Sequence, residues 1–211
     1  CSSDLNFGSL QHLCSCQRRV EHAAIAKRDR TVKIGKGRLF RRQEPFSGNS
    51  PIAFAQADIE GKTIVMTTTN GTRAINLAQG AKQLVIGSFL NMTALSNWLI
   101  TQNENVLLLC SGWKDKFNLE DSVFAGAVMD KLLESGKFGL EEDSSIAAKY
   151  LFMAARDNFM SILKAAPRRR RIEKLKLNED VKYCLTPDQS SIIPILREGV
   201  LVPMEVEVPK D

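Results

Sequence analysis

The sequence predicts an α/β fold in which helices cover a mostly parallel sheet, and two observations lead to this prediction. First, three short apolar runs rich in Val, Ile and Leu lie at 62–68, 83–88 and 105–111. Such runs are typical of strands that are buried on both faces. Second, a helix-like stretch follows each run. This alternation of strands and helices favours one layered domain with right-handed crossovers.

Capping residues mark the boundaries of the predicted helices. Asn91 precedes the stretch 92–102, Asn118 precedes the stretch 119–136, and a glycine closes both the latter stretch and the one at 72–80. Asn is favoured before the first turn of a helix, and Gly is favoured just after the last turn. Further elements are expected as helices at 144–166, 168–176 and 179–185, and as a late extended segment at 191–208 that completes the sheet or its rim.

Length, composition and charge limit the classes of protein that the sequence can encode. The 211 residues suffice for one sizeable domain, with an ordinary apolar fraction of 44% and charged fraction of 25%. The net charge of +5 is concentrated in residues 1–47, which hold 10 Lys and Arg against 4 Asp and Glu. We interpret the other basic cluster, RRRR at 168–171, as a solvated helical face. Because the excess charge is confined to residues 1–47, we expect no nucleic-acid partner. Because no run reaches about 18 apolar residues, we expect no membrane partner.

The chain divides into an irregular basic segment, 1–47, and a regular body, 48–211. The first segment shows no sustained helical or strand period, so we expect either a disordered arm or a small irregular subdomain. It begins with Cys1 instead of methionine, which leads us to expect a fragment or a processed product.

The histidines and cysteines exclude several kinds of chemistry. His12 lies near Cys14 and Cys16, but no second Cys/His pair follows at zinc-finger spacing, so we predict no metal there. The other histidine is His22, so the body lacks the histidine of a catalytic triad or a phosphohistidine. Cys110 ends an apolar run and is expected to be packed. This cysteine usage predicts a reduced, cytoplasmic setting.

Polar loops follow the three predicted strands, at 67–73, 88–91 and 111–118. Ligands of open parallel sheets bind beyond the carboxyl ends of the strands. If the three strands are parallel, the three loops lie at the same edge. The sequence then predicts one site built from all three loops.

The first of these loops has the composition of either a capped turn or an anion cradle. Asn70-Gly71 tolerates positive φ, and the helix predicted to begin near Thr72 adds unpaired amides. The guanidinium of Arg73 suits phosphate, sulfonate or carboxylate oxygens. In the alternative, the turn only caps the helix and Arg73 forms a surface ion pair. Hydroxyl donors for an anion would come from Thr68, Thr69 and Thr72.

Two acidic residues, Glu120 and Asp121, fall in the first turn of the third predicted helix. Acidic residues are favoured there because they compensate the helix dipole. In the alternative, one or two carboxylates hold a hydrated Mg²⁺ ion against a substrate phosphate. Adjacent helical residues point about 100° apart, so only one is expected to face the site, and Asp121 is the preferred ligand. The sequence therefore predicts metal-assisted chemistry on an anionic substrate.

Blocks of the body resemble the 2-phosphosulfolactate phosphatases, the ComB family. GKTIVMTTTNGTRA (61–74) is the specific block, and GNSP (48–51), GSFLN (87–91), LCSG (109–112), FNLEDSVFAGA (117–127), EDVKYCL (179–185) and IPILREG (193–199) support it. The resemblance implies a three-layer α/β/α sandwich and a Mg²⁺-dependent phosphatase. Its expected substrate is 2-phospho-3-sulfolactate or a related 2-hydroxy-acid phosphate ester, in coenzyme M or sulfolactate biosynthesis.

With this resemblance, the expected catalytic residues are Arg73, Asp121 and Glu120, with Mg²⁺ held by Asp121 and Glu120. The expected partner is a small anionic phosphorylated substrate, and a homodimer is compatible with the sequence. The residues expected to bind substrate or phosphate are Thr68, Thr69, Asn70, Gly71, Thr72, Arg73, Ser88, Asn91, Asn49 and Ser50.

The segment 1–47 departs from the family pattern. A block like DVLRATST and a GER…GFD block are expected before GNSP, but GKGRLFRRQEPFS stands at 35–47. Our hypothesis is a reading-frame error or a 5′ fragment joined to a family-like body, and a divergent arm is the alternative. Two functions therefore remain open, an active phosphatase and a catalytically impaired anion-binding module. A basic nucleic-acid binder would rest on this segment alone.

Overall fold

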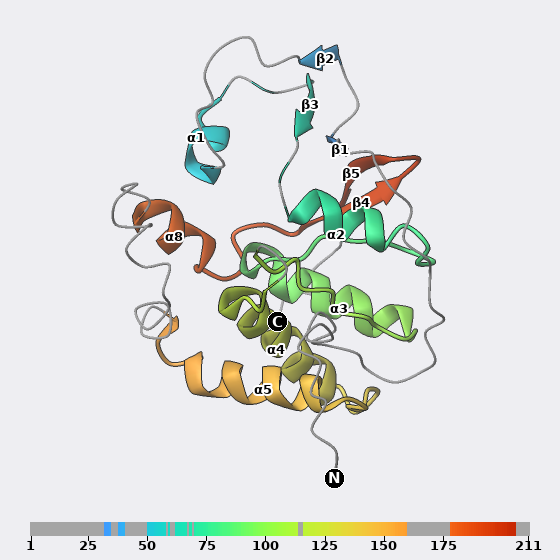
Figure 1. Ribbon diagram of the computed structural model, residues 1–211, viewed down its shortest axis with the longest axis vertical. Coiled ribbons are helices and arrows are strands. Elements are labelled where there is room, and N and C mark those ends of the chain that lie inside the picture. The colour runs from blue at the N-terminus through green and yellow to red at the C-terminus, as the bar shows by residue number, and fades with distance from the viewer. Residues whose placement is uncertain are drawn as a thin grey trace.

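A computed structural model describes residues 32–34, 38–40, 50–57, 59, 62–66, 68, 70–113, 116–159 and 178–205. In this part of the chain, helices and strands form a mixed α/β architecture. Figure 1 shows the sheet at the top and α3, α4 and α5 below it. The elements are β1 (Val32–Ile34), β2 (Arg38–Phe40), α1 (Pro51–Ala55), β3 (Lys62–Met66), α2 (Gly71–Leu77), the 3₁₀ turn η2 (Phe89–Asn91), α3 (Met92–Gln102), α4 (Leu119–Glu134), α5 (Asp143–Ala155), α8 (Asn178–Cys184), β4 (Ile192–Arg197) and β5 (Val200–Glu205).

The sheet is mixed, with the strand order β2-β3-β1-β5-β4. The pairs β2–β3 and β1–β5 are parallel, whereas β1–β3 and β4–β5 are antiparallel. β4 and β5 form a tight hairpin, because Glu198 and Gly199 between them both have positive φ, 49° and 76°, as a two-residue type I′ turn requires. The predicted mostly parallel sheet is therefore not confirmed, and neither is the three-layer sandwich.

The three predicted strands have three different outcomes. The first is confirmed as β3. In the second, 83–88, Val85 forms a bridge with Ile195 of β4 in antiparallel orientation. The N–H groups of Ile86 and Leu196 donate to Pro194 and Leu84 carbonyls, each at 2.8 Å. The third prediction is wrong, because residues 105–111 form no strand and only Leu107 takes part in a bridge.

The predicted helices of the body agree more closely with the structure. α3 and α4 begin directly after Asn91 and Asn118, as predicted. Gly136 has φ of 69° just beyond α4, in the left-handed region that favours glycine. α5 and α8 largely overlap the ranges expected for helices, although each begins one residue earlier and α5 already ends at Ala155. The predicted helix at 168–176 lies outside the described residues, as does the end of the one at 144–166.

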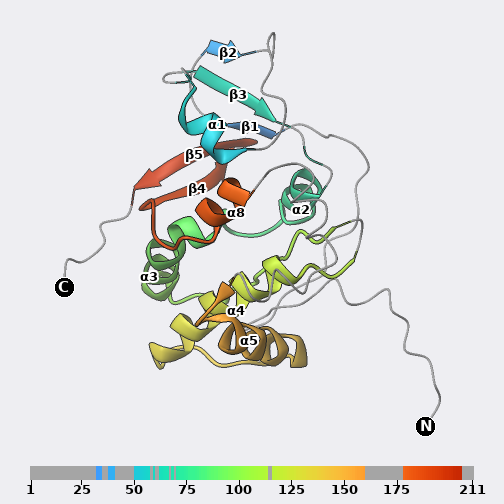
Figure 2. The ribbon, with the colours of Figure 1, turned by 90° about the vertical axis from the view of Figure 1, so that its left-hand side faces the viewer.

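The core lies where α3 and α4 pack beside β4. Leu95, Leu99, Val128, Leu132 and Ile193 are buried together in one cluster. Burial of a side chain of this size contributes on the order of 1.5–3 kcal/mol. Figure 2 shows α4 between α3 and α5. The core therefore fixes the helix whose first turn carries the two predicted metal ligands.

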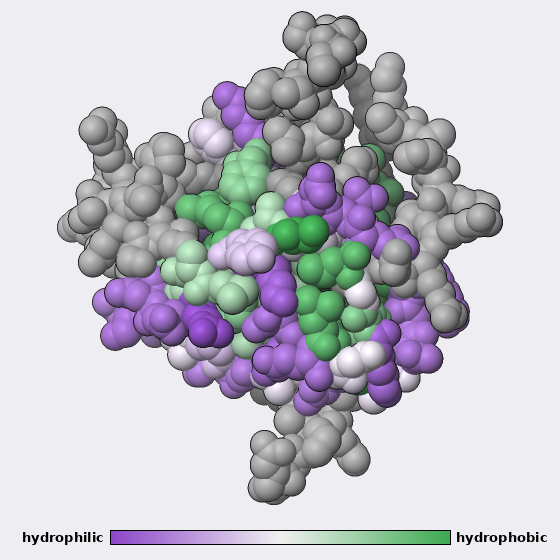
Figure 3. Space-filling view, turned by 90° about the horizontal axis from the view of Figure 1, so that it is seen from below, coloured by the Kyte–Doolittle hydropathy of each residue, from purple (hydrophilic) through white to green (hydrophobic). Residues whose placement is uncertain are grey.

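The α4–α5 contact depends on small residues. A Cβ added to Gly126 would lie 2.0 Å from the carbonyl oxygen of Ala148, so the two backbones approach too closely for any larger residue. On the outer side of α5, Ile146, Tyr150 and Met153 are exposed at helical spacing i, i+4, i+7. Figure 3 views the molecule from below, and apolar and polar patches alternate on this face.

The segment 1–47 contributes two strands that its sequence did not indicate. β1 pairs with β3 and β5, and β2 pairs with β3. His12, Cys14 and Cys16 lie outside the described residues, so the prediction of no metal there stays a prediction. Among the described helices, none has the length and the apolar character that crossing a membrane needs.

Candidate functional site

The turn that enters α2 is closed by two threonines. The N–H of Thr72 donates to Thr68 Oγ1 at 3.0 Å, and the N–H of Thr68 donates to Thr72 Oγ1 at 2.9 Å. Gly71 fits between them with little space, because an added Cβ would lie 3.0 Å from Thr68 Oγ1. The first bond satisfies a backbone donor that the start of α2 leaves unpaired, and the second closes the turn before the helix. Locally, the loop has the structure of a capped turn.

The capping limits what the threonines can offer to an anion. The two hydroxyl oxygens lie 3.4 Å apart, and one hydroxyl can donate to the other. Two hydroxyls have two protons, so at most one proton of this pair remains for a ligand. α2 is only seven residues long. The exposed Arg73 in its first turn is therefore the main source of positive charge in this loop.

Other predicted binders of this loop have different positions. Asn70 is half-buried directly before α2. Thr69 lies outside the described residues.

In the second loop, Asn91 is fully used by the fold. Its Oδ1 accepts the N–H of Ser88 at 2.9 Å. Its Nδ2 donates to the carbonyl oxygens of Ile86 and Ile192, at 3.2 and 3.0 Å. Asn91 is buried, and both of its amide hydrogens are occupied. It joins the 86–88 segment to β4, so a role at the rim of a substrate site has to rest on Ser88.

The third loop is held to α4 by Asp121. Its Oδ2 accepts the N–H of Gly112 at 2.8 Å and the hydroxyl of Ser111 at 3.1 Å. Its Oδ1 accepts Nδ2 of Asn118 at 2.7 Å. Asn118 in turn caps the helix, because its Oδ1 accepts the N–H of Glu120 at 3.2 Å. One carboxylate thus ties the loop to the first turn of the helix.

The two predicted metal ligands differ in how their oxygens are used. A carboxylate offers about four lone-pair positions, and donors of the protein occupy three of those of Asp121. The Glu120 side chain is half-buried and makes no hydrogen bond or ion pair with any residue of the described ranges. Mg²⁺ commonly uses one or two carboxylates together with water and substrate phosphate. The donor set fits such an ion through Glu120 better than through Asp121.

Wider clusters of metal-binding side chains are not found in the described part of the chain. No group of three or more His, Cys, Asp or Glu side chains gathers there at a spacing that could hold a metal ion. A metal at α4 would therefore take its remaining ligands from outside the described residues, with water and substrate as candidates.

Ser50 has a partner that the sequence did not suggest. Its hydroxyl donates to Asp180 Oδ1 at 2.7 Å and accepts the N–H of Ala53 at 3.1 Å, so it also caps α1. The contact joins the GNSP block to α8, 130 positions later. The Ser-Pro pair signals the start of a helix, but nothing local signals Asp180. Asn49 lies outside the described residues.

The two cysteines of the described residues, Cys110 and Cys184, are not joined in a disulfide. Partial shielding of the Cys184 sulfur from water, and next the negative charge of Asp180, raise the pKa of its thiol. A raised pKa keeps the thiol protonated and makes it a poor nucleophile. A covalent mechanism through Cys184 therefore has no support.

The prediction that the three loops lie at one edge of the sheet assumed three parallel strands, and the strand directions do not meet this condition. β4 runs in the direction of β3, because two of the three intervening pairings are antiparallel. The 84–86 segment runs opposite to β4 and hence opposite to β3. The carboxyl ends of β3 and of this segment therefore face opposite edges. The third predicted strand does not form, so the position of the third loop does not follow from strand direction, and one site built from all three loops stays a prediction.

Comparison with known proteins identifies the family. The model of the 2-phosphosulpholactate phosphatase family matches residues 23–199, so the match begins inside the irregular segment 1–47. A probable 2-phosphosulfolactate phosphatase from Caldanaerobacter subterraneus subsp. tengcongensis is 35% identical over 153 residues, 72% of this chain and 63% of the relative.

Two further relatives have the same description. The one from Thermotoga petrophila is 35% identical over 180 residues, 85% of this chain and 77% of the relative. The one from Cyanothece sp. is 30% identical over 201 residues, 92% of this chain and 82% of the relative. The chain thus aligns with somewhat less than two thirds of the first relative and with most of the other two. With a family match over 23–199, this chain belongs to the 2-phosphosulfolactate phosphatase family.

Proposed function

We propose that this protein hydrolyses the phosphate ester of 2-phospho-3-sulfolactate, or of a related 2-hydroxy acid, and that it depends on Mg²⁺. The observation that supports this most strongly is the family match over residues 23–199. That range includes the first turn of α2, which carries Arg73, and the first turn of α4, which carries Glu120 and Asp121. The reaction is therefore inferred from the family, and the candidate residues for it are inferred from these two regions.

In the proposed reaction, water adds to phosphorus, the ester P–O bond breaks, and a proton ends on the hydroxyl of the leaving sulfolactate. The Arg73 guanidinium binds the phosphate oxygens and offsets their charge, which a planar two-donor group does well. The Glu120 carboxylate would hold Mg²⁺, which supplies charge neutralisation of the phosphoryl group when bound. Asn70 and Gly71 shape the backbone around the anion, and Ser88, Asn49 and Ser50 are kept as outer candidates.

We also propose the setting that the sequence favours. The substrate is a small anionic metabolite in the cytoplasm, and the reaction serves coenzyme M or sulfolactate biosynthesis. An enzyme that takes a substrate with phosphate, sulfonate and carboxylate groups needs concentrated positive charge at its site, because charge of one sign raises the local concentration of the opposite ion.

The alternative, an impaired anion-binding module, rests on one observation. The family blocks expected before GNSP are replaced by GKGRLFRRQEPFS at 35–47. If those blocks carry essential groups, the chain binds the phosphate ester without releasing phosphate.

The test is phosphate release from racemic 2-phospho-3-sulfolactate by the 211-residue chain, with Mg²⁺ and with EDTA. We expect release that needs Mg²⁺, that falls about 100-fold or more in Arg73→Ala, and that requires more Mg²⁺ in Glu120→Gln. The matched controls are Lys137→Ala, which removes an exposed cation just beyond the C-terminal end of α4, and Glu134→Gln at that same end of α4, away from its first turn. Both controls should keep full activity.

Two outcomes would contradict the proposal. A folded chain that binds the ester but releases no phosphate would favour the impaired module. Equal activity with Mg²⁺ and with EDTA would remove the metal from the reaction while keeping the phosphatase.

A further inference from the structure

The third loop carries a small hairpin whose base is fixed by Asp121. The N–H of Trp113 donates to the carbonyl oxygen of Lys116 at 3.0 Å, and the N–H of Lys116 donates back to Trp113 at 3.1 Å. Gly112 at the base has φ of 67°, and a Cβ there would lie 2.8 Å from the Lys116 carbonyl oxygen. The backbone N–H of this same glycine donates to Asp121.

We propose that Asp121 is a positioning residue that holds the 113–116 hairpin against α4, and that it does not bind the metal. This inference rests on the proposed phosphatase function. Gly112 lies against the Lys116 carbonyl oxygen and donates to Asp121, so the backbone of the exposed Lys116 lies near the first turn of α4, which also carries Glu120. Asp121 thus sets where the positive charge of Lys116 meets the polyanionic substrate, while Glu120 binds the metal. Adjacent helix positions have separate tasks because they point about 100° apart.

A carboxylate suits this task better than other side chains. It accepts hydrogen bonds only, so its two oxygens can receive Gly112, Ser111 and Asn118 together. An amide in its place would turn an NH₂ group toward one of these donors. Asp121→Asn should therefore break the hydrogen bonds to one of the two carboxylate oxygens, and Asp121→Ala should break those to both oxygens.

The first test follows the hairpin without using activity. The protein has two tryptophans, Trp98 in α3 and Trp113 in the hairpin, so Trp98→Phe isolates the fluorescence of Trp113. In that background, Asp121→Ala should raise the acrylamide quenching of Trp113 about twofold or more, because the hairpin loses its charged hydrogen bonds. Ser111→Ala, which removes a single 3.1 Å contact, should raise quenching less. The control Glu120→Gln should leave quenching unchanged.

The second test separates positioning from metal binding. Asp121→Ala should raise KM roughly tenfold, and Ser111→Ala should raise it less. Both variants should leave the Mg²⁺ concentration for half-maximal activity unchanged, whereas Glu120→Gln should raise that concentration. Lys116→Ala should raise KM in the parent but add little in Asp121→Ala, because the misplaced lysine has already lost its effect.

The outcomes separate this inference from the proposed function. If the parent chain releases no phosphate, the proposed function fails, and quenching of Trp113 still decides whether Asp121 holds the hairpin. Unchanged quenching in Asp121→Ala overturns the inference. A Mg²⁺ requirement that rises in Asp121→Ala but not in Ser111→Ala overturns it too, because Asp121 would then be a ligand. Circular dichroism melts identify any variant that does not fold, and Ser111→Ala then supplies the test.

Discussion

The turns that enter α2 and α4 achieve the same local result by different means. At α2, Thr68 and Thr72 cap each other's backbone N–H groups with neutral hydroxyls only four positions apart. At α4, the Asp121 carboxylate reaches back nine positions to Gly112. The first turn depends only on residues that are close together in the sequence. The second depends on one charge that several donors share, so a single substitution should release the whole loop.

The largest expected difference between the two turns is in stability. Asp121→Ala leaves the N–H of Gly112 and the amide of Asn118 without this acceptor, and should lower the free energy of unfolding by about 2–3 kcal/mol. Thr72→Val, which keeps the shape of a buried side chain, leaves the N–H of Thr68 without its acceptor and should cost about 1 kcal/mol. Urea unfolding at pH 7 measures both, and equal losses would contradict the distinction.

Substitution of the glycines in the two turns should give a somewhat smaller difference in stability. Gly112→Ala forces a side chain into the left-handed region and into the Lys116 carbonyl, and should cost about 1–3 kcal/mol. At Gly71 an added Cβ meets only the Thr68 hydroxyl, at 3.0 Å, so Gly71→Ala should cost less than about 1 kcal/mol. Thermal melts rank the pair. A larger loss at Gly71 would show that its turn is the more tightly constrained of the two.

Sequence reasoning succeeded where the cause of a structure is local. Asn118 caps α4 and Gly136 follows its end, because the capping preferences act within a few residues. It failed where the cause is distant. β1 and β2 are held by pairing with β3 and β5, and no period in their own residues predicts this.

The candidate site shows the same division. The sequence identified the loops and both acidic residues, because polar residues before helices are visible in the sequence. It named Asp121 and Glu120 as metal ligands and preferred Asp121. That assignment stays a prediction, and the hydrogen bonds of the Asp121 carboxylate favour Glu120 as the ligand. It also missed Asp180, whose contact with Ser50 exists only after α1 and α8 pack together.

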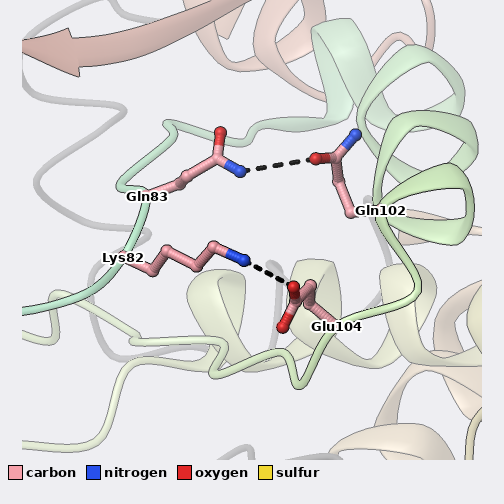
Figure 4. Close-up of polar contacts among 4 residues, drawn as sticks. All are labelled: Lys82, Gln83, Gln102 and Glu104. Atoms are coloured by element: carbon pink, nitrogen blue, oxygen red, sulfur yellow. Dashed lines mark hydrogen bonds and ion pairs between the residues drawn. The ribbon is translucent and has the colours of Figure 1, made fainter.

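The smallest expected effect comes from a charge pair that is not part of either turn. Lys82 donates to Glu104 on the surface, beside the uncharged pair Gln83–Gln102 (Figure 4). The hydrogen bond from Lys82, and next its positive charge, lower the pKa of Glu104 from 4.5. A lowered pKa means that the folded protein favours the ionised form, so the pair stabilises the fold above the ordinary pKa. That contribution disappears as the pH falls through the folded value.

Because the ion pair of Glu104 is exposed to solvent, the loss of stability should be barely detectable and should vanish in high salt. Urea unfolding between pH 6 and pH 3 of the parent and of Lys82→Met measures it, and Gln83→Met serves as the control that does not titrate. The difference between the parent and Lys82→Met should shrink as the pH falls below 4.5, while the difference for Gln83→Met stays constant. If the pH-dependent loss of unfolding free energy were as large as that of Asp121→Ala, the difference in solvent exposure would not explain the greater importance of the Asp121 hydrogen bonds.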